Sequence, residues 1–315
     1  MTSKPLSKSS FQLGYALSGG TLRSAAHIGV IEVLHAHGIE ADIVAGTSGG
    51  SLIGAMYANG LSPVWMSGIA NRFPGIRLID WSMPLLQALK ILTLVPLHYL
   101  HIVKNPAHFI PFGLIKGKKF EQYVRTLLAV TPVRTPIPLV VATTDLLQNQ
   151  TVIYHSRLSL PEDTNGLAQA GTWIPLDTAD DQRLLASVIH ASCALPGLFE
   201  PVAIGGRTLI DGGIRNYLPI DLLSVLGVKK VIAVDLHKTA IDDPIDMFPE
   251  VINRSFDIML DQITLFRAKA YHPFIITPKI KHVNWTSFDK VLACIDAGRE
   301  AALQALPAIK DYLKQ

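Results

Sequence analysis

Cysteine and charge are both scarce in this sequence. Its 315 residues include two cysteines, Cys193 and Cys294, which lie too far apart to form a redox pair or a zinc site. We therefore expect both thiols to be reduced and to fill the core, with no metal site. Charged residues make up 17% of the chain and the net charge is +3. So small a charge gives no reason to expect nucleic acid as a partner, but it permits contact with an anionic membrane surface.

Long uninterrupted apolar runs are also missing. Residues 1–11 are polar, carry lysines and have no apolar core of signal-peptide length. We therefore expect a cytoplasmic protein, with contact at the periphery of a membrane left open. The nearest candidate for a membrane span is residues 83–103, but Lys90, Pro96 and two histidines interrupt it. Because a span needs about 20 predominantly apolar residues, we expect no transmembrane helix.

Hydrophobic residues, by contrast, make up 49% of the chain, and they fall into alternating strand-like and helix-like segments. This alternation predicts one α/β domain that spans residues 1–315. Residues 62–120 are apolar and rich in proline and histidine, so we expect a cap or lid-like insertion there. Residues 165–181 have the composition of a loop. The C-terminal helix is expected to begin near residue 288 and to be interrupted at Pro307.

Two glycine-rich turns each follow a predicted strand near the N-terminus. A strand at residues 11–17 leads into the turn at 18–24, and after a helix at 25–37 a second strand at 39–45 leads into the turn at 46–50. Two parallel strands joined by a helix form a βαβ unit with a right-handed crossover. Ligands bind beyond the carboxyl ends of such strands, so both turns are expected at the same edge of the sheet.

The second turn has the G-x-S-x-G pattern of a nucleophile elbow, with Ser48 at its centre. A serine that points out of a tight turn between a strand and a helix needs glycine neighbours, because side chains there would collide with both elements. Residues 51–59 are typical of a helix that ends at Gly60, and the positive end of its dipole favours an alkoxide or an oxyanion. A glycine-rich turn without chemistry is the plain alternative. The strand-then-helix context favours the nucleophile.

Four segments, taken in order, resemble the patatin-like phospholipase family of acyl hydrolases. They correspond to the family's glycine-rich oxyanion loop, its nucleophile motif, the segment before its catalytic aspartate and its D-G-G/A motif, and they lie at residues 17–30, 46–50, 191–201 and 211–213. The resemblance covers roughly residues 12–236 and implies a three-layer α/β/α fold with a mostly parallel central sheet. The order of the four segments makes the resemblance far more specific than any one of them.

The resemblance also implies a serine–aspartate dyad, in which Ser48 attacks an ester carbonyl and Asp211 takes its proton. The N–H groups of the oxyanion hole would come from Gly19, Gly20, Thr21 and Gly49. An aspartate near its ordinary pKa of about 3.9 is a weak base for a hydroxyl, so partial burial must raise its proton affinity. This mechanism uses neither a metal nor an organic cofactor.

Other assignments stay open for these residues. An aspartate followed by glycine, as at Asp211, also fits a turn that closes a hairpin. Ser48, Asp211 and His237 follow the chain order of an α/β-hydrolase triad. In that fold, however, several strands normally precede the nucleophile, and here only one strand precedes the one that carries Ser48. The sequence therefore favours the dyad, and we expect His27 and His190 to be helix-packing residues.

The first turn departs from the family pattern G-G-G-x-R/K-G. Gly19, Gly20 and Arg23 match it, whereas Thr21 and Ser24 stand at its third and last glycine positions. Threonine restricts φ and can narrow the approach to an oxyanion hole, but we expect Thr21 to lie in a permitted conformation. Arg23 is a candidate substrate-binding residue. The sequence supports two roles equally: Arg23 could bind a phosphate group, or it could brace the loop. A nucleotide site is a weak competitor, because the turn lacks the Walker lysine.

The sequence thus predicts a hydrolase that acts on phospholipid or other lipid esters. An esterase for short, soluble acyl esters is the alternative enzyme. A lipid-binding protein with little turnover is the alternative of another class, suggested by the altered first turn. Within the expected insertion, aromatic side chains precede a group of lysines: Trp81, Tyr99, Phe109, Phe112, Lys116, Lys118 and Lys119. This composition fits a helical cap over the site and equally a lid that meets lipid, since aromatics and lysines favour that boundary.

Overall fold

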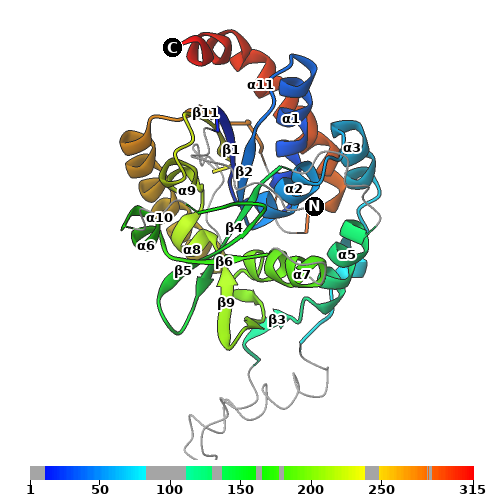
Figure 1. The fold of residues 1–315 in the computed structure, drawn as a ribbon. Helices are drawn as coiled ribbons and strands as arrows, with labels where there is room; N and C mark the ends of the chain where they lie inside the picture. The colour runs from blue at the N-terminus through cyan, green and yellow to red at the C-terminus, as the bar shows by residue number, and fades with distance from the viewer. Residues whose placement is uncertain are drawn as a thin grey trace, which may run out of the picture.

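The computed structural model describes residues 11–82, 111–129, 137–160, 165–176, 181–237, 248–281, 283 and 286–315. The central sheet has the strand order β11-β10-β1-β2-β4-β5-β6, to which β9 is added beside β4 and β8 beside β9. Most of these strands are labelled in Figure 1. The strands of this sheet are β1 (Leu13–Leu17), β2 (Ile43–Thr47), β4 (Leu139–Asp145), β5 (Gln150–Ser156), β6 (Thr172–Pro175), β8 (Val202–Ile204), β9 (Arg207–Asp211), β10 (Lys230–Val234) and β11 (Phe274–Ile276).

The sheet is mixed and mostly parallel, as predicted. From β11 through β10, β1 and β2 to β4 every neighbouring pair is parallel, and β6 is parallel to β5. The antiparallel pairs are β4 with β5, β4 with β9 and β8 with β9. The register of β1 and β2 pairs Leu17 with Gly46. Both glycine-rich turns therefore lie at the same edge of the sheet, as the βαβ unit requires.

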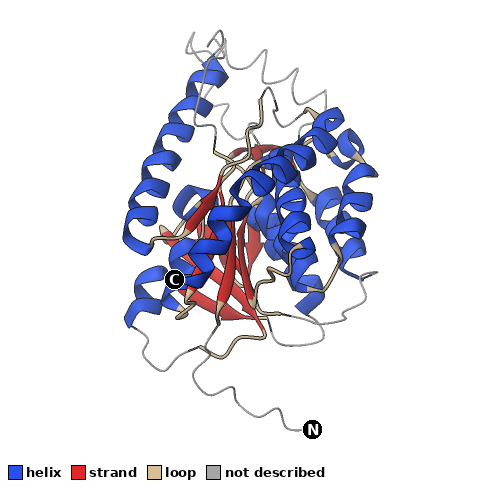
Figure 2. Cartoon of the chain, turned by 90° about the horizontal axis from the view of Figure 1, so that it is seen from above, coloured by secondary structure: helices blue, strands red, loops and turns tan. Residues whose placement is uncertain are grey.

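Helices cover both faces of the sheet, which confirms the three-layer α/β/α architecture (Figure 2). One face carries α1 (Ala26–Ala36), α2 (Gly49–Ala58), α3 (Pro63–Asn71), α5 (Lys118–Ala129), α7 (Asp181–Ser192) and α11 (Val291–Lys314). The other carries α6 (Asn165–Ala170), α9 (Ile220–Val225) and α10 (Phe248–Tyr271). The shorter elements are η1 (Thr21–Ala25), η2 (Gly75–Leu78), α8 (Gly213–Asn216), η4 (Phe288–Lys290) and a two-stranded sheet of β3 (Gly113–Ile115) and β7 (Gly197–Phe199).

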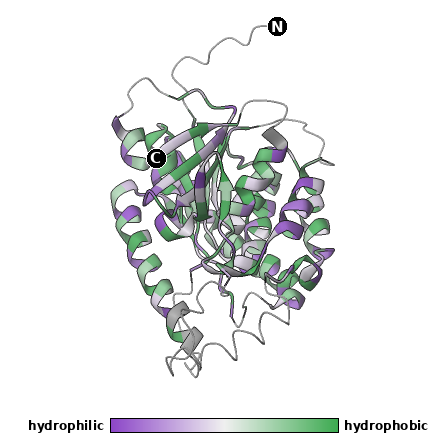
Figure 3. Cartoon of the chain, turned by 90° about the horizontal axis from the view of Figure 1, so that it is seen from below, coloured by the Kyte–Doolittle hydropathy of each residue, from purple (hydrophilic) through white to green (hydrophobic). Residues whose placement is uncertain are grey.

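Two cores result, one on each side of the sheet. In β1, Tyr15 and Leu17 belong to the core beneath α1 and α2, whereas Ala16 belongs to the core beneath α9. Successive strand residues point to opposite faces, so a strand buried on both sides reads as a continuous apolar run. Figure 3 shows the same division, with green residues gathered where the helices meet the sheet and purple residues mainly on the outer helix faces.

Two local expectations are wrong. The segment expected as a loop over residues 165–181 forms α6 and the edge strand β6, which pairs with β5. Both elements are too short to show a period, and Trp173 ties them together by donating its indole N–H to the carbonyl oxygen of Leu167 at 3.0 Å. Helix α11 also continues through Pro307. Ala302 and Ile309 are buried on either side of the proline, and this packing sustains the helix where one hydrogen bond is lost.

The expected insertion at residues 62–120 is described in part. It contributes α3, η2 and β3, while residues 83–110 lie outside the described residues, and with them Tyr99, Phe109 and the segment 83–103 that came nearest to a membrane span. Across the described ranges, no helix combines the length and the apolar character needed to cross a membrane.

Candidate active site

Ser48 occupies a sharp turn between β2 and α2. Its backbone has φ 52° and ψ −130°, a region that a residue other than glycine enters only when its surroundings hold it there. The Ser48 N–H donates to Ser192 Oγ at 2.8 Å, and the Ser48 carbonyl oxygen accepts from the Ser51 N–H at 2.8 Å. A Cβ on Gly46 would overlap the backbone of Gly50, and a Cβ on Gly50 would overlap that of Leu17. The turn thus requires the glycines that the motif supplies.

Asp211 lies beside Ser48, although the two are far apart in sequence. It is the last residue of β9, and its side chain is 5% exposed. Both residues line the same cavity, and Asp211 Oδ1 accepts a hydrogen bond from the Gly213 N–H at 2.7 Å. Burial raises the pKa of Asp211 to about 6, although the Gly213 N–H and the nearby Ser48 side chain act to lower it. The carboxyl is therefore a stronger base than an exposed aspartate and is still ionised at neutral pH.

The hairpin alternative for Asp211 is not what the structure shows. The β8–β9 hairpin turns at Gly205 and Gly206, both with positive φ, and Asp211 is at the opposite end of β9. There its N–H donates to the carbonyl oxygen of Ala194 at 2.9 Å. This contact joins the strand to the end of α7, the segment that resembles the family's sequence before the aspartate.

Ser192 and Cys193 complete the contacts around Ser48, and neither was predicted to be part of the site. The buried hydroxyl of Ser192 donates to the carbonyl oxygen of Ala142 at 2.7 Å and accepts the Ser48 N–H. Burial raises the pKa of the Cys193 thiol, and the nearby side chains of Ser48 and Ser51 act against that rise. Cys294 is buried in the core as expected, and half-buried Cys193 packs against the same core but also lines the cavity described next.

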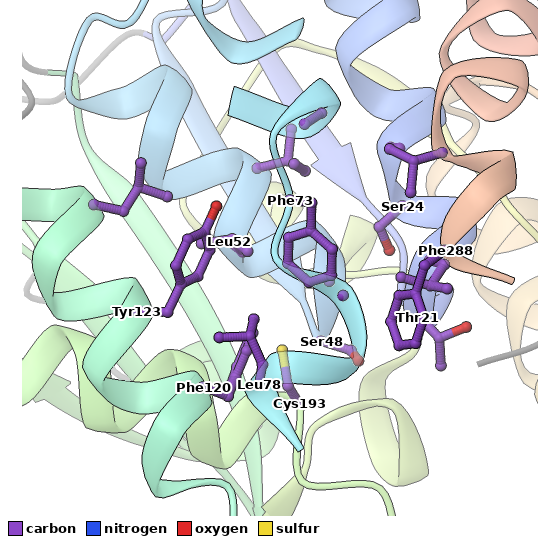
Figure 4. Close-up of a pocket in the computed structure, with 18 of the residues that line it drawn as sticks. Thr21, Ser24, Ser48, Leu52, Phe73, Leu78, Phe120, Tyr123, Cys193 and Phe288 are labelled. Carbon is purple, nitrogen blue, oxygen red and sulfur yellow. The ribbon is translucent and has the colours of Figure 1, made fainter. Parts of the chain in front are cut away.

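A cavity of about 200 Å3 opens beside Ser48 (Figure 4). Most of its lining is apolar and comes from the helical layer above the sheet, with Leu52, Phe73, Leu78, Phe120 and Phe288 among its walls. Its hydroxyl and carboxyl groups belong to Thr21, Ser24, Ser48, Tyr123 and Asp211. The few polar groups are thus set in a largely hydrophobic wall.

Helix α5 forms one side of this cavity and is tied to α7 by Glu121. The carboxylate of Glu121 is 3.1 Å from His190 Nδ1 and accepts the Ser187 hydroxyl at 2.8 Å. The His190 contact is the main reason that the pKa of Glu121 falls to about 2. At the start of α5, the Asp80 carboxylate accepts the N–H groups of Gly117 and Lys118, each at 2.9 Å. The part of the insertion nearest the site is therefore firmly joined to the sheet domain.

The first glycine-rich turn lies against the start of α2. The Gly19 N–H donates to the carbonyl oxygen of Tyr217 at 3.2 Å, so in this structure it is already engaged. The first N–H groups of a helix have no acceptor within the helix, and Thr21 begins η1 as Gly49 begins α2. N–H groups suited to an oxyanion therefore flank Ser48 from two elements.

Thr21 does not lie in the permitted conformation that we expected. Its φ is 49°, in the left-handed region that β-branched residues avoid. The turn imposes this geometry, and glycine, the family's residue at this position, would adopt it without strain. The Thr21 hydroxyl donates to the carbonyl oxygen of Gly20 at 2.7 Å, which offsets part of the cost.

We expect Thr21→Gly to stabilise the protein by about 1 kcal/mol, because relief of strain worth about 1–3 kcal/mol exceeds the added freedom of the unfolded chain. The measurement is urea unfolding at equilibrium. Thr126→Gly, on the exposed face of α5, is the matched control and should be destabilised, because glycine is a poorer helix former than threonine. A loss of stability in Thr21→Gly as large as in the control would show that the backbone at Thr21 is unstrained.

Arg23 and His237 lie outside the cavity. Neither lines it, and no histidine is among its described lining residues. His237 follows β10, where its N–H donates to Asp235 Oδ1 at 2.8 Å and its ring meets that of Tyr217 edge-on with centroids 6.0 Å apart. Burial raises the pKa of Asp235, and the charge of Arg23 acts against that rise. The structure therefore brings Ser48 and Asp211 to one cavity and places His237 and Arg23 outside its lining.

His27 and His190, the two histidines expected to be helix-packing residues, are both buried in helices. His27 of α1 is fully buried, and its Nε2 is 2.9 Å from the carbonyl oxygen of Ser18. Burial lowers the pKa of His27 to about 4, so the ring is neutral at physiological pH. His190 of α7 is buried against Glu121.

Comparisons with known proteins point to one family. A family model described as patatin-like phospholipase matches residues 15–224, more than half of the chain. The chain is 29% identical over 231 residues to a lysophospholipase NTE1 of Mycosarcoma maydis, a match that covers 73% of this chain and 10% of that protein. It is 28% identical over 294 residues to the uncharacterized protein YqhO of Bacillus subtilis, which covers 90% of this chain and 94% of that protein. The chain thus spans only a small part of the fungal relative.

Among solved structures, the chain is similar to VipD from Legionella pneumophila. The TM-score is 0.46 at 16% sequence identity, over 95% of this chain and 67% of that one.

Proposed function

Because the chain belongs to the patatin-like phospholipase family, we propose that it is a lipid acyl hydrolase in which Ser48 and Asp211 form the catalytic dyad. The observation that carries the proposal is that Ser48, held in a strained turn, and the buried carboxyl of Asp211 line the same apolar cavity, close enough for the Ser48 side chain to lower the pKa of Asp211. A nucleophile, a base of raised pKa and a hydrophobic binding space are the parts that ester hydrolysis on a lipid needs.

The first half-reaction transfers the acyl group to the enzyme. Ser48 Oγ forms a bond to the ester carbonyl carbon while Asp211 accepts the hydroxyl proton, and the π electrons of the carbonyl move onto its oxygen. We assign this oxyanion to the N–H groups of Gly20, Thr21 and Gly49, with Gly19 shaping the turn. When the tetrahedral intermediate collapses, the bond to the alcohol breaks and the leaving oxygen takes the proton from Asp211.

The second half-reaction releases the fatty acid. A water molecule gives a proton to Asp211 and attacks the carbonyl carbon of the acyl-serine, again through an oxyanion. The bond to Ser48 Oγ then breaks, and the proton on Asp211 passes to the serine oxygen. Asp211 serves both steps because its raised pKa makes it a better proton acceptor without neutralising it at pH 7.

The walls of the cavity favour a long acyl chain over a short, soluble one. Leu52, Phe73 and Phe120 offer apolar contact along the space that leads from Ser48, and each buried methylene contributes about 0.8 kcal/mol. The fungal relative bears the name lysophospholipase, so a phospholipid with a single acyl chain is our first candidate substrate.

We also place the substrate at a lipid surface. The insertion elements that line the cavity through Met66, Leu78 and Ile115 also expose large apolar side chains to solvent. These are Val64, Trp65, Ile76, Trp81, Phe112 and Leu114. Exposed tryptophans beside lysines are typical of the membrane–water boundary, and such contact would let a single lipid enter the cavity without crossing water.

A panel of p-nitrophenyl esters of increasing chain length tests the proposed function. We expect kcat/KM to rise by about fourfold per added methylene until the cavity is filled, and to rise again when the long-chain esters are presented in anionic vesicles. A rate that does not depend on chain length would support the esterase for soluble esters. If the protein binds the long-chain esters but neither hydrolyses them nor reacts with a fluorophosphonate probe, the lipid-binding alternative is correct.

A further inference from the structure

Ser24 carries a hydroxyl that the fold does not use. The residue is 4% exposed, and its Oγ has no hydrogen-bond partner within the described ranges. A buried hydroxyl without a partner is costly, and nearly all such groups in proteins are satisfied. Ser24 also lines the cavity, where the family pattern has a glycine. An unpaired hydroxyl in the wall that contacts the substrate indicates that its hydrogen-bond partner is an atom of the bound substrate.

The position of this hydroxyl relates it to the reacting atoms. Ser24 Oγ lies directly against Gly49, so closely that a Cβ on that glycine would overlap it, and a Cβ on Gly20 would lie 3.4 Å from it. The hydroxyl is therefore between the two backbone segments from which we assign the oxyanion donors. Figure 4 shows Ser24, Ser48 and Thr21 among the residues that line the pocket.

We propose that the Ser24 hydroxyl is a side-chain donor of the oxyanion hole. This inference rests on the proposed function and adds a residue to it. The Gly19 N–H is held by the carbonyl oxygen of Tyr217, so the turn has one backbone donor fewer to offer, and the serine hydroxyl supplies another. Since Ser24 Oγ has no acceptor among the described residues, we assign its hydrogen bond to the stage at which charge develops on the substrate oxygen. An interaction present only in the transition state raises kcat.

The first test is Ser24→Ala, assayed on the best ester of the panel. We expect kcat to fall by at least about 10-fold with KM changed less than about 2-fold, because one oxyanion donor is worth roughly 10²–10³ in rate. The melting temperature should equal or exceed that of the wild type, since the variant removes an unpaired buried hydroxyl. A purely structural role for Ser24 predicts the opposite, a lower melting temperature with kcat retained.

Ser67→Ala is the matched control. The Ser67 hydroxyl on α3 is also buried and without a partner in the described part of the chain, but Ser67 does not line the cavity. Its removal should leave kcat unchanged. If Ser67→Ala and Ser24→Ala give the same kcat, the hydroxyl of Ser24 takes no part in the reaction and the proposal is overturned.

A long-chain alkyl trifluoromethyl ketone gives an independent readout, because its adduct with a serine carries the oxyanion while the matching alkyl alcohol does not. Ser24→Ala should weaken inhibition by the ketone by the same factor as kcat/KM and leave binding of the alcohol unchanged. Equal inhibition of wild type and variant would refute the role of Ser24 but would leave the proposed function standing. A wild type that neither hydrolyses the esters nor reacts with a fluorophosphonate would refute the proposed function, and the role of Ser24 with it.

Discussion

Substituting Ser48 with alanine should reduce ester hydrolysis to near the uncatalysed background and leave the fold intact. In the proposed mechanism Ser48 Oγ is the atom that receives the acyl group, and loss of the nucleophile of a serine hydrolase costs up to roughly 10⁶ in kcat. The contacts that hold the turn are made by the backbone of Ser48, through its N–H to Ser192 and its carbonyl oxygen to Ser51, and alanine keeps both.

The measurement combines kcat on the best long-chain ester with labelling by a fluorophosphonate, which should be lost in Ser48→Ala. Ser224→Ala is a suitable control, because its hydroxyl donates to the carbonyl oxygen of Ile220 within α9, outside the cavity. Substantial hydrolysis by a purified Ser48→Ala variant with an unchanged melting temperature would show that the nucleophile is another residue.

The elbow could be predicted from the sequence because its requirements are local. A strand, a turn and a helix follow one another within residues 43–59, and the close approach of Gly46 to Gly50 is a property of that turn alone. The partnership with Asp211 is not local. The sequence around Asp211 is equally compatible with a hairpin turn, and only the resemblance of four ordered segments indicated that β9 brings this carboxyl to Ser48.

The parts of the site that the sequence left undetected depend on contacts between distant segments. Ser192 ends α7 and Cys193 follows it. Both lie in the segment 191–201 that resembles the family, but that resemblance did not indicate that Ser192 would bind the Ser48 N–H or that Cys193 would line the cavity. The conformation of Thr21 was predicted incorrectly, because the family's glycine indicated a turn but not the sign of φ that the turn imposes on threonine. In each case the missing information was a backbone geometry set by packing between elements.

Asp211→Asn should lower kcat by several orders of magnitude while preserving the site's shape. The amide oxygen can still accept the Gly213 N–H, but an amide cannot take the Ser48 proton, and general-base catalysis contributes roughly 10²–10⁴ in rate. In the wild type the base works only when ionised, so kcat/KM should fall below about pH 6, the pKa of Asp211 in the free protein. A profile of kcat/KM against pH, measured on the best ester, checks this expected fall on the acid side.

His237→Ala separates the dyad from a triad. His237 does not line the cavity, so its removal should cost less than about tenfold in kcat, well below the 10²–10⁴ expected of a general base. If His237→Ala is as damaging as Asp211→Asn, a serine–histidine–aspartate triad is the better account and the dyad is wrong.

The same Asp211→Asn variant should be more stable than the wild type at neutral pH, although it is far less active. The pKa of Asp211 is raised from its ordinary 3.8 to about 6 by burial, so between these values the folded state binds more protons than the unfolded state, and the free energy of unfolding falls as pH rises. A pKa rise of this size corresponds to about 3 kcal/mol in the free energy of unfolding. The folded protein loses all of this stability above about pH 6. Asparagine does not ionise, so the variant should gain about 1–3 kcal/mol at pH 8 and almost nothing at pH 4. Urea unfolding at the two pH values measures the difference. If Asp211→Asn is more stable than the wild type by the same amount at pH 4 and at pH 8, the gain does not come from removal of the buried charge. The raised pKa of Asp211, which the catalytic base requires, would then lose its support.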